Sequence, residues 1–118
     1  MKLRREFRNR DELISYCEKQ FSESTAICSA VSTIRGGRKQ ATRRLESVQP
    51  RAYARTRNSL EGAVTGLSPY LRHGVIALAE AVRSVKRIAG SAEAGKKLLQ
   101  ELAWRDYWRR VLDEIGDG

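Results

Sequence analysis

Apolar residues recur at steps of three and four along most of this chain, which is the spacing of helices that bury one face. Near the N-terminus, Leu13, Ile14 and Cys17 follow this spacing and predict a helix over residues 10–20. The next segment, 22–37, is rich in Ser and Thr and ends in two Gly residues. That composition is typical of a connection between helices.

Five further helices are predicted by the same periodicity and by the Gly and Pro residues that interrupt it. They cover residues 38–47, a brief stretch within 53–60, and residues 68–74, 75–89 and 91–115. The start at Ser68-Pro69 is the sharpest signal, because Ser is favoured as an N-cap and Pro as the first helical residue. No run alternates apolar and polar residues with the period of a strand. The chain is therefore predicted to be all-α, with about five or six helices.

The chain is small and strongly basic. At 118 residues it has room for one domain with a modest core. Its 23 Lys and Arg residues, against 14 Asp and Glu residues, give a formal net charge of +9. This balance favours polyanionic partners, namely nucleic acid, a phosphorylated cofactor or an acidic membrane surface. Solubility alone is the alternative explanation of the charge.

Several other classes of protein are not expected from this composition. Cys17 and Cys28 are too few for a disulfide framework, and with His73 as the single histidine a zinc site is not expected. No stretch approaches the roughly eighteen apolar residues of a membrane span, and no apolar run follows the basic N-terminus as in a secretory signal. We therefore expect a cytoplasmic protein with reduced thiols and no membrane partner.

The segment around Ser68 places hydroxyl groups beside a predicted helix start. The first N–H groups of a helix lack internal partners and carry a partial positive charge, which a phosphate can satisfy. Thr65 and Ser68 add hydroxyl donors there, and Gly66 lets a ligand approach the backbone. Because every capped helix shares most of these features, an ordinary Ser cap is the alternative.

The last predicted helix carries aromatic and charged residues on one flank. At about 100° per residue, Glu101, Trp104, Arg105 and Trp108 fall together. Leu112 and Ile115 extend this flank. A different side of the helix carries Leu99, Ala103 and Tyr107. A helix that is apolar on two sides usually lies inside a larger protein.

Two interpretations of this flank remain open. Glu101 and Arg105 are four residues apart and can pair with each other, while both Trp residues pack in a core. Alternatively, Arg105 faces a phosphate, Glu101 faces a hydrogen-bonding ligand, and Trp104 offers a flat surface to a base.

Taken in order, these segments resemble the FAD-binding helical domain of DNA photolyases and cryptochromes. The resemblance is carried by Tyr53, Arg57-Asn58, Leu67-Ser68-Pro69-Tyr70-Leu71-Arg72 and Gln100-Glu101-Leu102-Ala103-Trp104-Arg105-Asp106-Tyr107. It covers at least residues 34–118, preceded by an N-terminal helix and connection in residues 1–33. The whole chain, 1–118, is therefore expected to be one partial FAD-binding domain.

The resemblance implies two sets of site residues. The residues expected against FAD are Tyr53, Thr65, Leu67, Ser68 and Arg105. Among them, Arg105 would approach the FAD phosphates. Glu101 and Trp104 would face a pyrimidine dimer flipped out of DNA, the first by hydrogen bonding and the second by packing. Light-excited reduced FAD would split the dimer, so we expect no catalytic side chain in this segment.

The chain departs from the family pattern in three ways. The family commonly has Thr-Ser-Arg-Leu-Ser in its phosphate loop, whereas this chain has Val64-Thr65-Gly66-Leu67-Ser68, with one hydroxyl and one Arg fewer. The family's α/β antenna domain is absent, and its later helices, which complete the flavin cavity and relay electrons, would follow Gly118. We therefore expect a truncated member without repair activity of its own, which a missing C-terminal half could complete.

Two readings without catalysis are the alternatives. The chain could be a small basic helical module that binds nucleic acid through arginine and lysine side chains. The residues available for such phosphate contacts are Arg38, Lys39, Arg43, Arg44, Arg51, Arg55 and Arg57. It could also be an interaction protein that docks its apolar last helix onto a partner.

Overall fold

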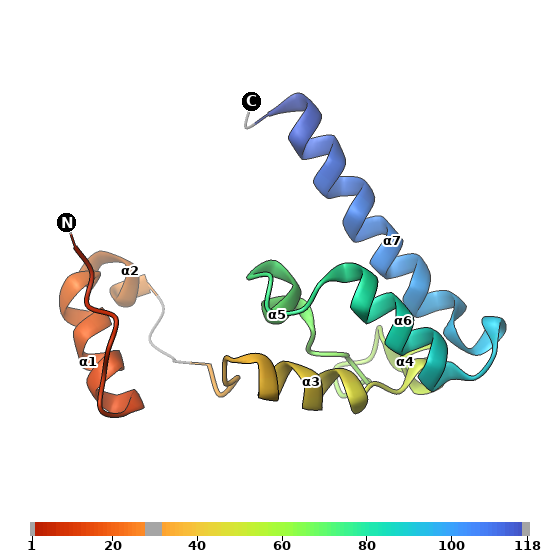
Figure 1. Cartoon of the computed structure of the whole chain (residues 1–118), viewed down its shortest axis with the longest axis horizontal. Helices are drawn as coiled ribbons and strands as arrows, with labels where there is room; N and C mark the ends of the chain where they lie inside the picture. Colours follow the sequence, from red (N-terminus) through yellow and green to blue (C-terminus); the bar gives the residue numbers. More distant parts are fainter. Residues whose placement is uncertain (1, 28–31, 117–118) are drawn as a thin grey trace. The chain divides into compact units, whose positions relative to one another are not determined.

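The computed structural model describes residues 2–27 and 32–116, and within them every regular element is an α-helix (Figure 1). Seven helices are present in these residues, and the predicted all-α class is confirmed. The chain divides into two compact units, Met1–Arg35 and Gly36–Gly118, and each has its own packing. None of the described helices is both long and apolar enough to cross a membrane.

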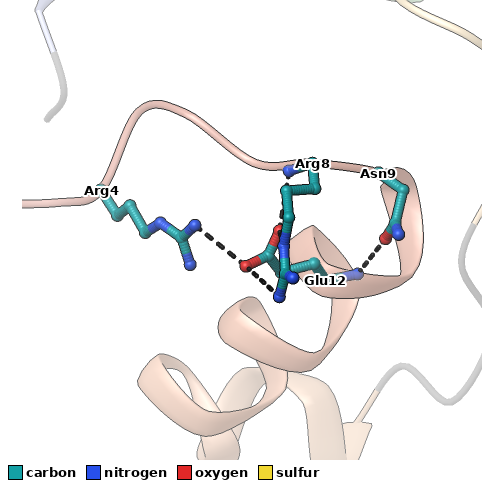
Figure 2. Close-up of polar contacts among 4 residues, drawn as sticks. All are labelled: Arg4, Arg8, Asn9 and Glu12. Carbon is teal, nitrogen blue, oxygen red and sulfur yellow. Dashed lines mark hydrogen bonds and ion pairs between the residues drawn. The ribbon is translucent and has the colours of Figure 1, made fainter.

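The first unit is organised around the start of α1, Arg10–Gln20. Figure 2 shows the Asn9 side chain accepting a hydrogen bond from the Glu12 backbone N–H, at 2.9 Å, which caps the helix. The Glu12 carboxylate accepts a 2.7 Å bond from the Arg8 backbone N–H and lies 2.9 Å from the Arg4 guanidinium. These contacts, led by the Arg8 backbone N–H, hold the pKa of Glu12 below its ordinary value.

A second helix, α2, occupies Ser22–Ile27, where the sequence pattern predicts a connection. That part of the prediction is wrong, whereas the bounds predicted for α1 are confirmed. Glu23 lies in the first turn of α2, where a negative charge favours a helix. The Ser and Thr residues around it are typical of a connection, so composition alone does not predict this helix. Cys17 is a half-buried free thiol, while Cys28 lies outside the described residues.

The second unit contains the other five helices. They are α3 (Arg38–Glu46), α4 (Pro50–Thr56), α5 (Ser68–Arg72), α6 (Leu78–Ala89) and α7 (Ala92–Ile115). Helix α7 packs against α4 and α6, and α6 also packs against α3 and α4. One core joins these elements, built from Ala41, Leu45, Val48, Leu67, Tyr70, Ile76, Ala81, Val85, Leu98 and Leu102.

The junction between α6 and α7 follows from local sequence. The Ser91 side chain accepts a 3.2 Å hydrogen bond from the Ala94 N–H, so Ser91 caps α7 as its position predicts. Gly95 is buried, and a methyl group there would lie 3.2 Å from the Ala89 Cβ. The absence of a side chain at Gly95 therefore permits the close approach of α6 and α7 that covers Leu98.

Helix α4 begins at Pro50 and ends at Thr56, so it starts three residues earlier and ends four residues earlier than the helix predicted over 53–60. The Thr56 hydroxyl donates to the Ala52 carbonyl at 2.7 Å and accepts from the Ala63 N–H at 2.9 Å. This double use of one hydroxyl turns the chain away from the helix axis. As a result, Leu60 is fully exposed instead of lying on a buried helix face.

Helix α6 begins at Leu78, three residues later than predicted. The backbone N–H groups of Val75 and Ile76 donate to the Tyr70 carbonyl, at 2.8 and 3.4 Å. Both residues therefore belong to the turn that closes α5, although Ile76 contributes to the core with 1% of its surface exposed. Their spacing follows the helix period, but both lie in a turn, where Ile76 is buried and Val75 is half-buried.

Candidate functional site

The predicted phosphate loop is a tight turn that leads into α5. Leu67 precedes α5 in a helical conformation, and no side chain caps this helix. The prediction that Ser68 is the N-cap is wrong, because Ser68 is already the first residue of the helix and its backbone cannot adopt the extended conformation of a cap. The Thr65 hydroxyl instead accepts a 3.4 Å bond from the Leu67 N–H.

The side chains of this loop face different surroundings. Leu67 is a core residue, with 2% of its surface exposed, so its side chain is not available to a ligand. Ser68 is exposed and Thr65 is half-buried. The two hydroxyl groups, and not Leu67, are therefore the side-chain groups of the loop that can contact a bound anion.

Arg44, which the sequence pattern places on the solvent-exposed side of α3, lies against this loop. A methyl group at Gly66 would lie 3.3 Å from the Arg44 Nε and 3.4 Å from its Cδ and Cζ. The Arg44 side chain therefore crosses the backbone of Gly66, which has a φ of 64°. The sequence offers no signal for this contact, because Arg44 and Gly66 are brought together only by the packing of α3.

Tyr53 and Glu101 lie on two helices that pack together, α4 and α7. Tyr53 is half-buried and packs against the core. Glu101 lies 3.3 Å from the Arg57 guanidinium at the end of α4 and 3.1 Å from the Lys97 ammonium. Glu101 is therefore bound to two cations, and the alternative in which it pairs with Arg105 is not what forms.

Arg105 lies one turn further along α7 and is half-buried. Among the described residues, no carboxylate lies within salt-bridge distance of its guanidinium. The nearby acid on the same helix, Asp106, binds Arg110 at 2.8 Å instead. Arg105 is thus a half-buried residue whose guanidinium has no carboxylate partner in the described part of the chain.

Three aromatic residues of α7, Trp104, Tyr107 and Trp108, form an exposed group that we call the aromatic trio. Their exposed fractions are 53%, 52% and 60%. The two indole rings are 6.3 Å apart and nearly parallel, and Tyr107 meets each of them edge-on. Figure 1 shows the C-terminal part of α7 extending away from α3 to α6, so these apolar side chains are not covered by the described part of the chain.

The seven predicted residues fall into two groups. Tyr53, Glu101, Trp104 and Arg105 belong to α4 and α7, whereas Thr65, Leu67 and Ser68 belong to the loop before α5. Both groups are attached to one core, but within residues 36–116 no hydrogen bond or ion pair joins Arg105 to either loop hydroxyl. The structure thus places the two groups on one unit, around one core, without a hydrogen bond or ion pair from Arg105 to the loop hydroxyls.

A shallow hollow of about 700 Å³ lies between the end of α6 and the first half of α7. Apolar atoms of Leu99 and Ala103 line it, with Lys86 and Lys96 beside them. None of the seven predicted site residues lines this hollow. In the part of the chain that the structure describes, no three His, Cys, Asp or Glu side chains gather as a metal ion would require.

Comparison with known proteins gives no relative on which a function could be based. No family model, no curated protein and no solved structure matches the chain. Its function is therefore inferred from its residues and their geometry.

Proposed function

We propose that this chain is an FAD-binding segment of photolyase/cryptochrome type that also binds DNA containing a pyrimidine dimer. The observation that carries the proposal is Arg105, a half-buried residue whose guanidinium has no carboxylate partner among the described residues. Burying a charge is unfavourable unless an opposite charge compensates it. A phosphate of FAD would provide that compensation, and Arg is the side chain best suited to bind phosphate.

The remaining residues of the proposed FAD site act by positioning. Tyr53 is held on α4 by the core, and the hydroxyls of Thr65 and Ser68 are hydrogen-bond donors on the same unit. Bound FAD, once reduced and excited by light, would supply the electron that splits a pyrimidine dimer. The side chains of this chain bind and orient, and none is assigned a catalytic role.

Glu101 and Trp104 are the residues proposed to face the lesion. The Trp104 indole is 53% exposed, and its exposed surface is where a base would pack. Arg57 and Lys97 both contact the Oε1 oxygen of Glu101, which leaves Oε2 as a hydrogen-bond acceptor three positions before Trp104 on α7. An acceptor beside an aromatic surface is what recognition of a flipped base requires. A cytoplasmic location, where Cys17 stays a free thiol, belongs to the same proposal.

Binding of flavin to the purified chain tests this proposal. The protein would be titrated with FAD and with riboflavin, which lacks phosphates, while flavin fluorescence and protein-bound absorbance are followed. We expect FAD to bind at least about tenfold more tightly than riboflavin, because phosphate contacts with Arg are charge-assisted. No binding of either flavin would refute the FAD part of the proposal.

A second candidate is a basic module that binds nucleic acid without flavin. It is favoured by exposed cations on α3 and α4 that have no carboxylate within salt-bridge distance in the described chain: Lys39, Arg43, Arg51 and Arg55. Affinity for undamaged DNA that falls steeply with salt, together with no flavin binding, would favour this candidate. A preference for dimer-containing DNA over undamaged DNA at fixed salt would favour the first proposal.

A further inference from the structure

We propose that Arg44 is a phosphate ligand of the loop formed by Thr65, Gly66, Leu67 and Ser68, an inference that rests on the proposed FAD site. The guanidinium group of Arg44 crosses the backbone of Gly66, with its Nε 3.3 Å from where a methyl group of residue 66 would be. Because Gly66 has no side chain, nothing separates this cation from the loop. Arg44 of α3 therefore places a positive charge against the loop 65–68, whose own side chains are uncharged.

The charge of Arg44 is not used elsewhere in the described chain. The nearest acid along α3, Glu46, binds Arg87 of α6 at 2.7 Å. Another arginine of α3, Arg38, binds Glu80 of the same helix α6. The carboxylates near α3 are thus engaged by other cations, and within residues 36–116 none lies within salt-bridge distance of Arg44.

The loop that contains Gly66 supplies two more donors, the hydroxyls of Thr65 and Ser68. The Thr65 oxygen accepts the Leu67 N–H, which leaves the Thr65 hydroxyl proton available to a ligand. Ser68 is exposed, and its hydroxyl has no hydrogen-bond partner in the described chain. With five residues, α5 is too short for its dipole to matter, so the donors that count are side chains. One guanidinium and two hydroxyls fit the oxygens of a phosphate.

Phosphate in this system can come from two sources, the diphosphate of FAD or the backbone of DNA. A planar guanidinium binds two phosphate oxygens at once, and a diphosphate offers such pairs on adjacent groups. Thr65 and Ser68 are three positions apart on a tight turn, and two adjacent phosphate groups would engage both hydroxyls. We therefore assign the Arg44 site to the diphosphate of the flavin cofactor.

The test uses the whole chain and two arginines of the same helix. Arg44→Ala and the control Arg43→Ala remove one exposed arginine each from neighbouring positions of α3. FAD, riboflavin, inorganic pyrophosphate and undamaged duplex DNA are titrated against both variants and the wild type. We expect Arg44→Ala to weaken FAD and pyrophosphate by about tenfold or more and to leave riboflavin unchanged, while Arg43→Ala stays within about twofold of wild type. Arg44→Lys should recover part of the loss, because it keeps the charge but not the planar group.

The outcomes separate this inference from the proposed function. Equal pyrophosphate affinity of the Arg44→Ala and Arg43→Ala variants, or no pyrophosphate binding by the wild type, would overturn the role of Arg44. Pyrophosphate binding that depends on Arg44, without any added affinity for FAD, would keep the anion site and remove the flavin. A loss confined to DNA binding would overturn the assignment to the cofactor.

Discussion

The two halves of α7 share one helix but differ in what covers them. The first half, from Ala92 to Leu102, buries Ala94, Gly95, Leu98 and Leu102 against α4 and α6. The second half, which carries the aromatic trio and then Leu112 and Ile115, leaves all five of these large residues more than half exposed. Both halves therefore show the same apolar periodicity, but only the half that packs against α4 and α6 is buried.

This difference bears on function, because exposed apolar surface on a small unit usually marks a site of interaction. The aromatic trio begins one turn after Glu101, at the point where α7 leaves its neighbours. The packed half thus acts as an anchor that fixes Glu101, and the exposed half presents flat aromatic rings. A base, a flavin ring and an apolar partner are each able to cover such a surface.

The largest effect is expected from truncating a leucine in each half. Leu98→Ala should lower the free energy of unfolding by about 2–5 kcal/mol, because Leu98 is 3% exposed and a cavity would remain. Leu112→Ala should change it by no more than about 0.5 kcal/mol, because Leu112 is 52% exposed. Urea unfolding followed by circular dichroism measures both. Similar losses in the two variants would show that the second half is packed as tightly as the first.

A smaller difference is expected between two ion pairs, one in each half. The Arg57–Glu101 pair joins α4 to the packed half, and both side chains are about one-third exposed. The Asp106–Arg110 pair lies within the second half, with 44% and 75% of its side chains exposed. Double-mutant cycles on unfolding should give a coupling of about 0.5–1 kcal/mol for the first pair and about 0.3 kcal/mol for the second, since water screens exposed charges. A larger coupling for the second pair would contradict the contrast between the halves.

The smallest effect is a change in the acid dependence of unfolding. The hydrogen bond from Arg38 holds the pKa of Glu80 below its ordinary value of 4.5. Because folding lowers this pKa, Glu80 contributes stability at pH values above 4.5, and the contribution is lost as the pH falls through the lowered value. Glu80→Gln should therefore flatten the fall in stability below pH 4.5, relative to wild type.

The matched control for this experiment is Glu114→Gln. Glu114 lies in the exposed half of α7 and has no ion pair in the described part of the chain. Urea unfolding at a series of pH values compares the two variants. An acid profile of Glu80→Gln that coincides with that of wild type would mean that the Arg38–Glu80 contact does not persist in solution.

The elements that could be predicted from the sequence are those fixed by local chemistry. Helix α1 has the predicted bounds, and α7 starts after Ser91 because a serine at that position caps a helix by itself. Gly90, just before it, ends α6 where predicted. These signals act over a few residues, so no knowledge of the rest of the fold is needed.

The features that could not be predicted depend on contacts between distant residues. Helix α4 stops early because Thr56 bonds to Ala63, seven positions away. Arg44 reaches Gly66 only because α3 packs beside the loop, and Glu101 is bound by Arg57 of another helix. The exposure of the aromatic trio is likewise a property of the packing, since its spacing is equally suited to a core.

The central claim is that Arg105 binds the flavin phosphates, while Trp104 packs against the DNA lesion. The most direct test measures FAD affinity and affinity for dimer-containing DNA in Arg105→Ala and Trp104→Ala, with Arg109→Ala as the control for charge on the same helix. We expect Arg105→Ala to weaken FAD by about tenfold and more than Trp104→Ala does. Trp104→Ala should instead weaken the DNA by about tenfold, as loss of a stacked base predicts. Equal FAD affinity in the two variants, with unchanged DNA affinity for Trp104→Ala, would contradict both roles.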